Sequence, residues 1–243
     1  MISRMQRGQN VWIGLGLFAL VLVACEDGTH SGADSPKQRA ADSLIDTNAQ
    51  DPATPQLDPT ETTDAQRGDV EPAERLRTYT NAKHDFRFSY PQGWSVMSPD
   101  EVYEKTGGLL TPSPAALVFV VNDGDPDKNI NVLFTGDVRR EAPNNGAARR
   151  FFEEFREQYP SMIRQQLPGA RVVSTRVFDH AGGVAFEAVY NVPRGQTPMR
   201  QKSVLVIVSG KAYTFTCTSL AAVYDEADRS GFKPILDTLT FEQ

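Results

Sequence analysis

The chain has 243 residues, a formal net charge of −6 and two cysteines. This length can hold one globular domain with a proper core beside further segments. Lys and Arg are not in excess, so the composition gives no support for a nucleic-acid-binding protein.

The first 25 residues have the layout of an export signal. Arg4 and Arg7 precede residues 11–23, a run of 13 residues without a charge. As a helix this run would span roughly 20 Å, less than the roughly 30 Å of a bilayer core. It is therefore too short for a comfortable transmembrane helix and is typical of a signal peptide.

Residues 22–25, which read Leu-Val-Ala-Cys, resemble the lipobox of bacterial lipoproteins. The resemblance implies cleavage between Ala24 and Cys25 and a lipid on the Cys25 thiol that anchors the protein in the cell envelope. Each acyl CH₂ contributes about 0.8 kcal/mol of membrane burial, so two or three chains hold the protein permanently. The choice between inner and outer membrane stays open. The alternatives are an uncleaved anchor and a plain signal with a chance cysteine.

The next segment has the composition of a tether. Residues 26–76 carry 12 Asp and Glu against 4 Lys and Arg, and no aromatic residue. Such a segment cannot bury enough apolar surface to fold, which predicts a disordered linker over 25–76 behind a signal peptide at 1–24. We interpret it as a spacer, with a specific binding tail as the alternative. The globular domain is predicted to cover 77–243.

The hydrophobic pattern from residue 77 onward predicts an α+β domain, an antiparallel sheet with helices on its faces. A helix is expected from Asn144 or Asn145, and Pro160 is expected to end or kink it. A second helical segment is expected over 221–238. Strands are expected at 78–80, 86–90, 94–96, 116–121, 129–135, 171–178, 184–192, 202–209 and 211–217.

Three stretches resemble the PsbP-like family. They are Tyr79-Thr80-Asn81 followed by residues 86–94 (Phe-Arg-Phe-Ser-Tyr-Pro-Gln-Gly-Trp), the Gly182-Gly183 turn, and residues 211–241, in which a strand, a helix and the ending Thr-Phe follow one another. The resemblance implies an α/β/α sandwich, the fold shared by the photosystem II extrinsic subunit PsbP and a Ran-binding nuclear import factor. It also implies a binding or accessory module without a shared catalytic constellation, and it transfers no site residue.

Polar clusters suggest little catalytic or metal chemistry. Asp123, Asp125 and Asp127 alternate in one turn, but Lys128 stands where an EF-hand needs Gly, so a solvated turn is favoured. The histidines are too far apart for a ligand set: His30, His84 and His180. No metal and no cofactor are expected.

No nucleophile elbow accompanies the Asp179-His180 pair, so a catalytic triad is not expected. Cys217 lies in an alternating strand on its aromatic face, where burial as a small hydrophobe is favoured over a reactive thiol. Once Cys25 carries lipid, no disulfide within the chain is possible.

One basic stretch is a candidate contact for an anionic partner. No acid occurs from residue 188 to residue 224, whereas Arg194, Arg200 and Lys202 lie there. Phospholipid headgroups or an acidic protein are the partners considered, and scattered solvated charges are the alternative.

The sequence thus predicts an envelope lipoprotein whose PsbP-like domain is a non-catalytic binding or accessory module. Its expected partners are the membrane, through the lipid, and an envelope protein, but not a nucleic acid. An enzyme with an unrecognised site and a passive structural protein are the alternatives.

Overall fold

The computed structural model describes residues 76–242, so the predicted signal peptide, Cys25 and the tether up to residue 75 lie outside the described residues. The helical elements are α2 (Pro99–Lys105), α3 (Asn145–Gln166) and a C-terminal helical segment of η1 (Ala221–Val223), α4 (Tyr224–Ala227), η2 (Asp228–Phe232) and α5 (Lys233–Asp237). The strands are β1 (Arg77–Asn81), β2 (Phe86–Tyr90), β3 (Trp94–Met97), β4 (Ala116–Asn122), β5 (Asp125–Asp137), β6 (Arg171–His180), β7 (Gly183–Val192), β8 (Met199–Val208), β9 (Lys211–Leu220) and β10 (Thr240–Phe241).

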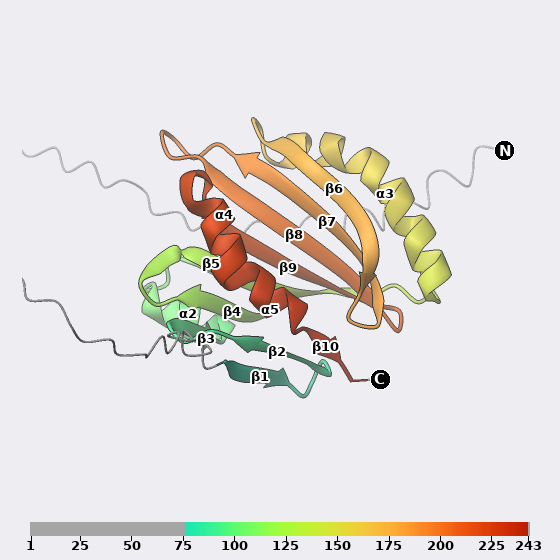
Figure 1. Cartoon of the computed structure of the whole chain (residues 1–243), viewed down its shortest axis with the longest axis horizontal. Coiled ribbons are helices and arrows are strands. Elements are labelled where there is room, and N and C mark those ends of the chain that lie inside the picture. Colours follow the sequence, from blue (N-terminus) through green and yellow to red (C-terminus); the bar gives the residue numbers. More distant parts are fainter. Residues whose placement is uncertain (1–75, 243) are drawn as a thin grey trace, which may run out of the picture. The chain divides into compact units, whose positions relative to one another are not determined.

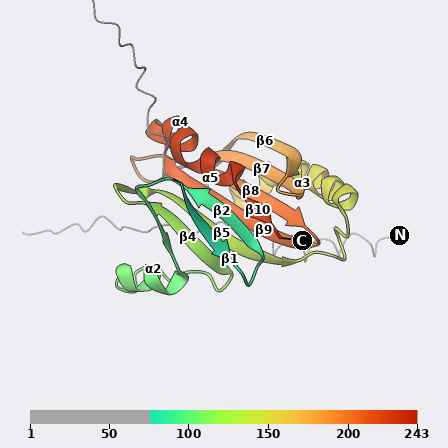
Figure 2. The same ribbon diagram turned by 60° about the horizontal axis from the view of Figure 1, so that its bottom comes forward.

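The strands form two antiparallel sheets (Figure 1). The large sheet has the order β3-β4-β5-β9-β8-β7-β6, and a small sheet of order β1-β2-β10 lies beside it (Figure 2). Strands β4 and β5 form a hairpin, and β6 to β9 form an antiparallel meander. The α+β class with antiparallel sheets is therefore confirmed.

Two tight turns fix the register of the meander. Ala181-Gly182 joins β6 to β7 and Ser209-Gly210 joins β8 to β9, with φ values of 52° and 80° in the first turn and 48° and 73° in the second. Positive φ at both central residues matches the right-handed twist of the two strands, and glycine accepts it without strain. As a result the strand residues face each other in a fixed order.

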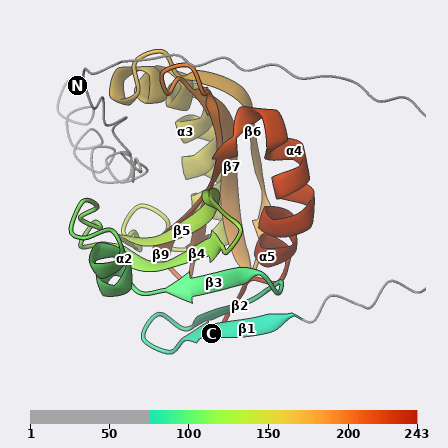
Figure 3. The same ribbon diagram turned by 90° about the vertical axis from the view of Figure 1, so that its left-hand side faces the viewer.

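Helices cover both faces of the large sheet (Figure 3). On one face α3 packs Phe152, Phe155 and Tyr159 around Phe186 of β7, with ring centroids 6.0, 5.0 and 5.1 Å away. The C-terminal helical segment covers part of the opposite face, where Phe232 meets Trp94 at 5.9 Å.

Pro160 was predicted to end or kink the helix, and it does not end it, because α3 runs through Pro160 to Gln166. The backbone carbonyl that loses its partner to proline belongs to the exposed Arg156, and buried Tyr159 and Ile163 hold both sides of the proline on the sheet.

Helix α2 was not predicted. Its signal was the capping box of Ser98 and Glu101, in which each residue bonds the other's backbone N–H.

Candidate functional site: a charged groove under the C-terminal helix

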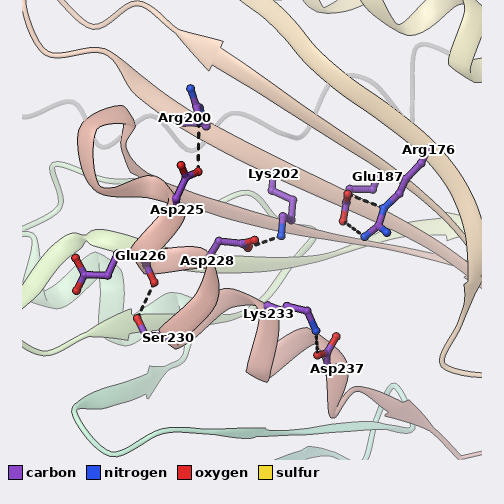
Figure 4. Close-up of polar contacts among 10 residues, drawn as sticks. All are labelled: Arg176, Glu187, Arg200, Lys202, Asp225, Glu226, Asp228, Ser230, Lys233 and Asp237. Atoms are coloured by element: carbon purple, nitrogen blue, oxygen red, sulfur yellow. Dashed lines mark hydrogen bonds and ion pairs between the residues drawn. The ribbon is translucent and has the colours of Figure 1, made fainter.

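A cavity of about 270 Å³ opens between the C-terminal helical segment and strands β6, β7 and β8. The C-terminal helical segment lies over β8 and β9 and does not extend over β6 and β7 (Figure 1). The cavity lies along the edge of this segment. We call it the charged groove. Its charged lining residues are Arg176, Glu187, Lys202, Asp228, Lys233 and Asp237 (Figure 4).

Strand alternation places the charges of one wall. Arg176, Phe178 and His180 are every second residue of β6 and line the groove, while Glu187 faces Arg176 directly in the β6–β7 register. Lys202 comes from β8. The β6–β7 pair therefore turns an acidic and a basic side chain toward the charged groove.

Arg176 and Glu187 form a two-pronged ion pair. Arg176 Nε donates to Glu187 Oε1 at 2.8 Å and Nη2 donates to Oε2 at 2.9 Å. This bonding raises the pKa of the Arg176 guanidinium, and the group also lies 4.4 Å from the Phe178 ring centre. The carboxylate side chain is 12% exposed and the arginine side chain 62% exposed, so Arg176 covers Glu187 and keeps a free edge toward the groove.

A second pair ties the sheet to the helix. Lys202 Nζ donates to Asp228 Oδ1, and the lysine side chain is only 9% exposed. Cys217 lies directly opposite Lys202 in the β8–β9 register and is fully buried, which raises the pKa of its thiol. The predicted burial of Cys217 beside Tyr213 and Phe215 is confirmed. A neutral thiol of this kind is a poor nucleophile.

Two polar atoms in the lining lack a hydrogen bond within residues 76–242. They are Nε2 of His180 and the hydroxyl of Tyr224, both buried. Burial lowers the pKa of His180, opposed by Asp237 and by the Leu236 carbonyl, and burial raises the pKa of Tyr224. Because the Leu236 carbonyl also bonds to His180, the Tyr224 hydroxyl is the lining group that lacks a partner outright.

The predicted anionic-partner residues lie near the same helix but carry acidic partners. Lys202 pairs with Asp228. Arg200 Nη1 lies 3.6 Å from Asp225 Oδ1, and Arg200 Nε donates a hydrogen bond to Asn191 Oδ1 at 2.9 Å. Arg194, in the loop between β7 and β8, lies 3.4 Å from Asp127 of β5. The structure thus brings Arg200 and Lys202 to one face of β8 and sets Arg194 apart.

The other sequence candidates are placed as follows. His84 packs between Phe134 and Tyr213, with ring centres 5.0 and 6.1 Å away. Asp125 lies 3.6 Å from Lys128 in an ion pair. Within residues 76–242, no three His, Cys, Asp or Glu side chains gather as a metal site requires. The predicted lipidation and cleavage residues, Cys25 and Ala24, and His30 lie outside the described residues, within which no helix is long and apolar enough to cross a membrane.

The charged groove was not predicted from the sequence. Its residues are separated by up to several tens of positions in the sequence. Only the folded arrangement of β6, β7, β8 and the C-terminal helical segment brings them together. A local signal did exist, since Glu187 stands inside the otherwise apolar strand 183–192 and Lys202 at the start of an apolar run. A charge at a position where alternation requires an apolar side chain is the mark that could have been used.

Comparison with known proteins gives the family. Residues 74–241 match the sequence model of the family described as PsbP. The solution structure of cyanobacterial PsbP (CyanoP) from Synechocystis sp. PCC 6803 has a TM-score of 0.51 at 17% identity, over 73% of this chain and 98% of that protein. LpqN, involved in cell envelope biogenesis of Mycobacterium tuberculosis, has a TM-score of 0.40 at 13% identity, over 70% of this chain and 92% of that protein. No match was found among curated proteins.

Proposed function

We propose, because this chain belongs to the PsbP family, that it is an envelope lipoprotein whose domain is a non-catalytic binding or accessory module. Residues 77–243 form the domain that binds, residues 25–76 form the tether, and Cys25 carries the lipid. The partners in this proposal are the membrane, through the lipid, and an envelope protein. Nucleic acid is not among them.

The observation that carries the binding role is the charged groove. Its acidic and basic side chains are already paired with one another, as Arg176 with Glu187 and Lys202 with Asp228. Paired charges fix positions in a binding surface, whereas acid-base catalysis needs a titratable group held near the working pH. The arrangement therefore fits recognition better than bond-making chemistry.

The anchor rests on the sequence of the first 25 residues. An uncharged run of 13 residues ends at a Leu-Val-Ala-Cys stretch, as a lipoprotein signal requires. The acidic segment after it would hold the domain roughly 40 Å from the membrane as a coil. Arg194, Arg200 and Lys202 remain proposed contacts for an anionic partner. Such a partner would have to displace Asp127, Asp225 and Asp228 from them.

The anchor is tested by intact mass of the protein from the membrane fraction, beside a Cys25→Ser variant. We expect the wild-type chain to begin at Cys25 with added acyl mass, and the variant to lose that mass and leave the membrane fraction. Ser35→Ala, in the predicted tether, is the control and should behave as wild type. A wild-type chain without acyl mass overturns the anchor.

The accessory role is tested by crosslinking in intact cells, followed by identification of the captured proteins. We expect the same envelope protein to be captured by wild type and by Arg139→Met, whose pair with Asp137 lies outside the groove. Glu187→Gln with Lys202→Met should reduce this capture. Capture that is equal for all three, or absent for all, contradicts the proposed role of the groove. Turnover of a substrate that these groove changes abolish would favour an enzyme instead.

A further inference from the structure

We propose that the charged groove binds a small zwitterion, a molecule that carries an ammonium group and a carboxylate or phosphodiester a few bonds apart. This inference rests on the proposed binding role and names its ligand class. The ligand would come either from a phospholipid headgroup or from a free amino acid, which share this chemistry.

The charge balance of the groove favours a zwitterion over a simple ion. Three formal positive charges and three formal negative charges line it, as Arg176, Lys202 and Lys233 with Glu187, Asp228 and Asp237. A lone anion would leave an excess charge in a partly buried space, which is unfavourable. A zwitterion brings one charge of each sign, so every group keeps a partner when it enters.

Two groups are accessible enough to exchange partners. Lys233 and Asp237 form a pair along α5, with side chains 63% and 56% exposed. On the opposite wall, Arg176 uses Nε and Nη2 for Glu187, and Nη1 has no hydrogen bond within residues 76–242. The ligand's anionic group would accept from Arg176 Nη1 and Lys233, and its ammonium would donate to Asp237.

The walls lie close enough to share one ligand. Asp237 opposes the lowering of the His180 pKa that burial causes, and it adds to the raised pKa of Arg176 behind the larger effect of Glu187. Its carboxylate on α5 lines the same cavity as both β6 side chains, Arg176 and His180. Because the Lys202–Asp228 pair is the more buried one, it stays in place as the end of the groove.

The Tyr224 hydroxyl and the apolar lining set the rest of the ligand. This hydroxyl has no hydrogen bond within residues 76–242, and a headgroup or an amino acid would supply one. Phe178, Val189 and Leu236 also line the groove and would contact the methylenes between the charged groups. A volume of about 270 Å³ suits a molecule of this size.

The test is calorimetric titration of the purified full chain in non-ionic detergent. Glycerophosphoethanolamine represents the lipid headgroup and 4-aminobutyrate represents the amino acid. Inorganic phosphate and ethylammonium carry only one charge sign each. We expect one of the two zwitterions to bind about fivefold more tightly than either single ion, the upper range for one exposed ion pair.

Variants locate the site. Lys233→Met and Asp237→Asn should each weaken zwitterion binding by about five- to tenfold, since both side chains are exposed and their loss leaves the core intact. Arg156→Met is the control, because Arg156 forms an equally exposed pair with Glu153 on α3, 2.9 Å apart. It should bind as wild type does.

Each outcome decides the inference. Preference for glycerophosphoethanolamine supports a headgroup site and preference for 4-aminobutyrate supports an amino-acid site. Equal binding of phosphate, no binding of any probe, or binding that ignores Lys233 and Asp237 overturns it. If the zwitterions fail while crosslinking still captures an envelope protein, only the ligand class is wrong. If that capture fails while a zwitterion binds, the accessory role is wrong and the ligand class stands.

Discussion

The two faces of the large sheet differ in the side chains that they carry. The face under α3 is almost wholly apolar, with Phe152, Phe155, Phe186 and Tyr190 each at most 1% exposed. The face under the C-terminal helical segment is apolar near β4, β5 and β9, but it carries ion pairs toward β6. One layer of strands thus carries an apolar face on one side and a partly charged groove on the other, because alternation separates the two sets of side chains.

The largest effect is expected on the α3 face. Phe186→Ala removes a ring that contacts Phe152, Phe155 and Tyr159, and should lower the free energy of unfolding by about 3 to 5 kcal/mol. Urea unfolding at pH 7 measures it. A loss below about 1 kcal/mol would mean that this face is less tightly packed than the ring distances indicate.

A smaller effect is expected in the groove. Lys202→Met leaves the Asp228 carboxylate without its partner and should cost about 1 to 3 kcal/mol, whereas Lys202→Met with Asp228→Leu should recover part of that loss. The double-mutant cycle by urea unfolding tests this. Two costs that simply add would show that the pair contributes nothing as a pair.

The helix cap of α3 should contribute about 1 kcal/mol. Asn144 is the N-cap residue, and its side chain accepts a bond from the Ala147 N–H at 3.0 Å. Asn144→Ala removes this acceptor and lowers stability, while Asn144→Asp should retain it. Thermal unfolding followed by circular dichroism compares the two. If both variants lose equally, the cap bond is not the cause.

The smallest effect is a dependence on pH from the groove face. Burial lowers the pKa of His180 in the folded state, so the unfolded chain binds a proton more readily. Stability should therefore be fully present above pH about 6.5, the unfolded value, and should decline as the pH falls through it. His180→Gln should flatten this slope, measured by urea unfolding between pH 5 and pH 8. His84, whose pKa is lowered as well, supplies the remaining slope.

Much of the fold follows from local sequence signals. The start of α3 was predicted at Asn144 or Asn145, and the long strands of the large sheet were predicted close to their observed bounds. The groove was missed because its pairs depend on exact placement: Arg176 faces Glu187 only in the observed β6–β7 register, and Lys202 of β8 meets Asp228 of the helical segment across 26 positions. Sequence spacing alone does not contain these contacts. Pro160 suggested a helix end that is absent, because the packing of α3 on the sheet outweighed the local cost of a proline inside a helix.

The small sheet ties the two ends of the described domain together. Strand β2, near residue 90, pairs with β10 at residues 240–241. Strand β5 pairs with β9, which lies some 80 residues later along the chain. A two-stranded hairpin of β1 and β2 is marginal alone. Strands β2 and β5 therefore each lack one neighbour until residues far along the chain have been synthesised. A chain with such long-range pairing is expected to fold slowly.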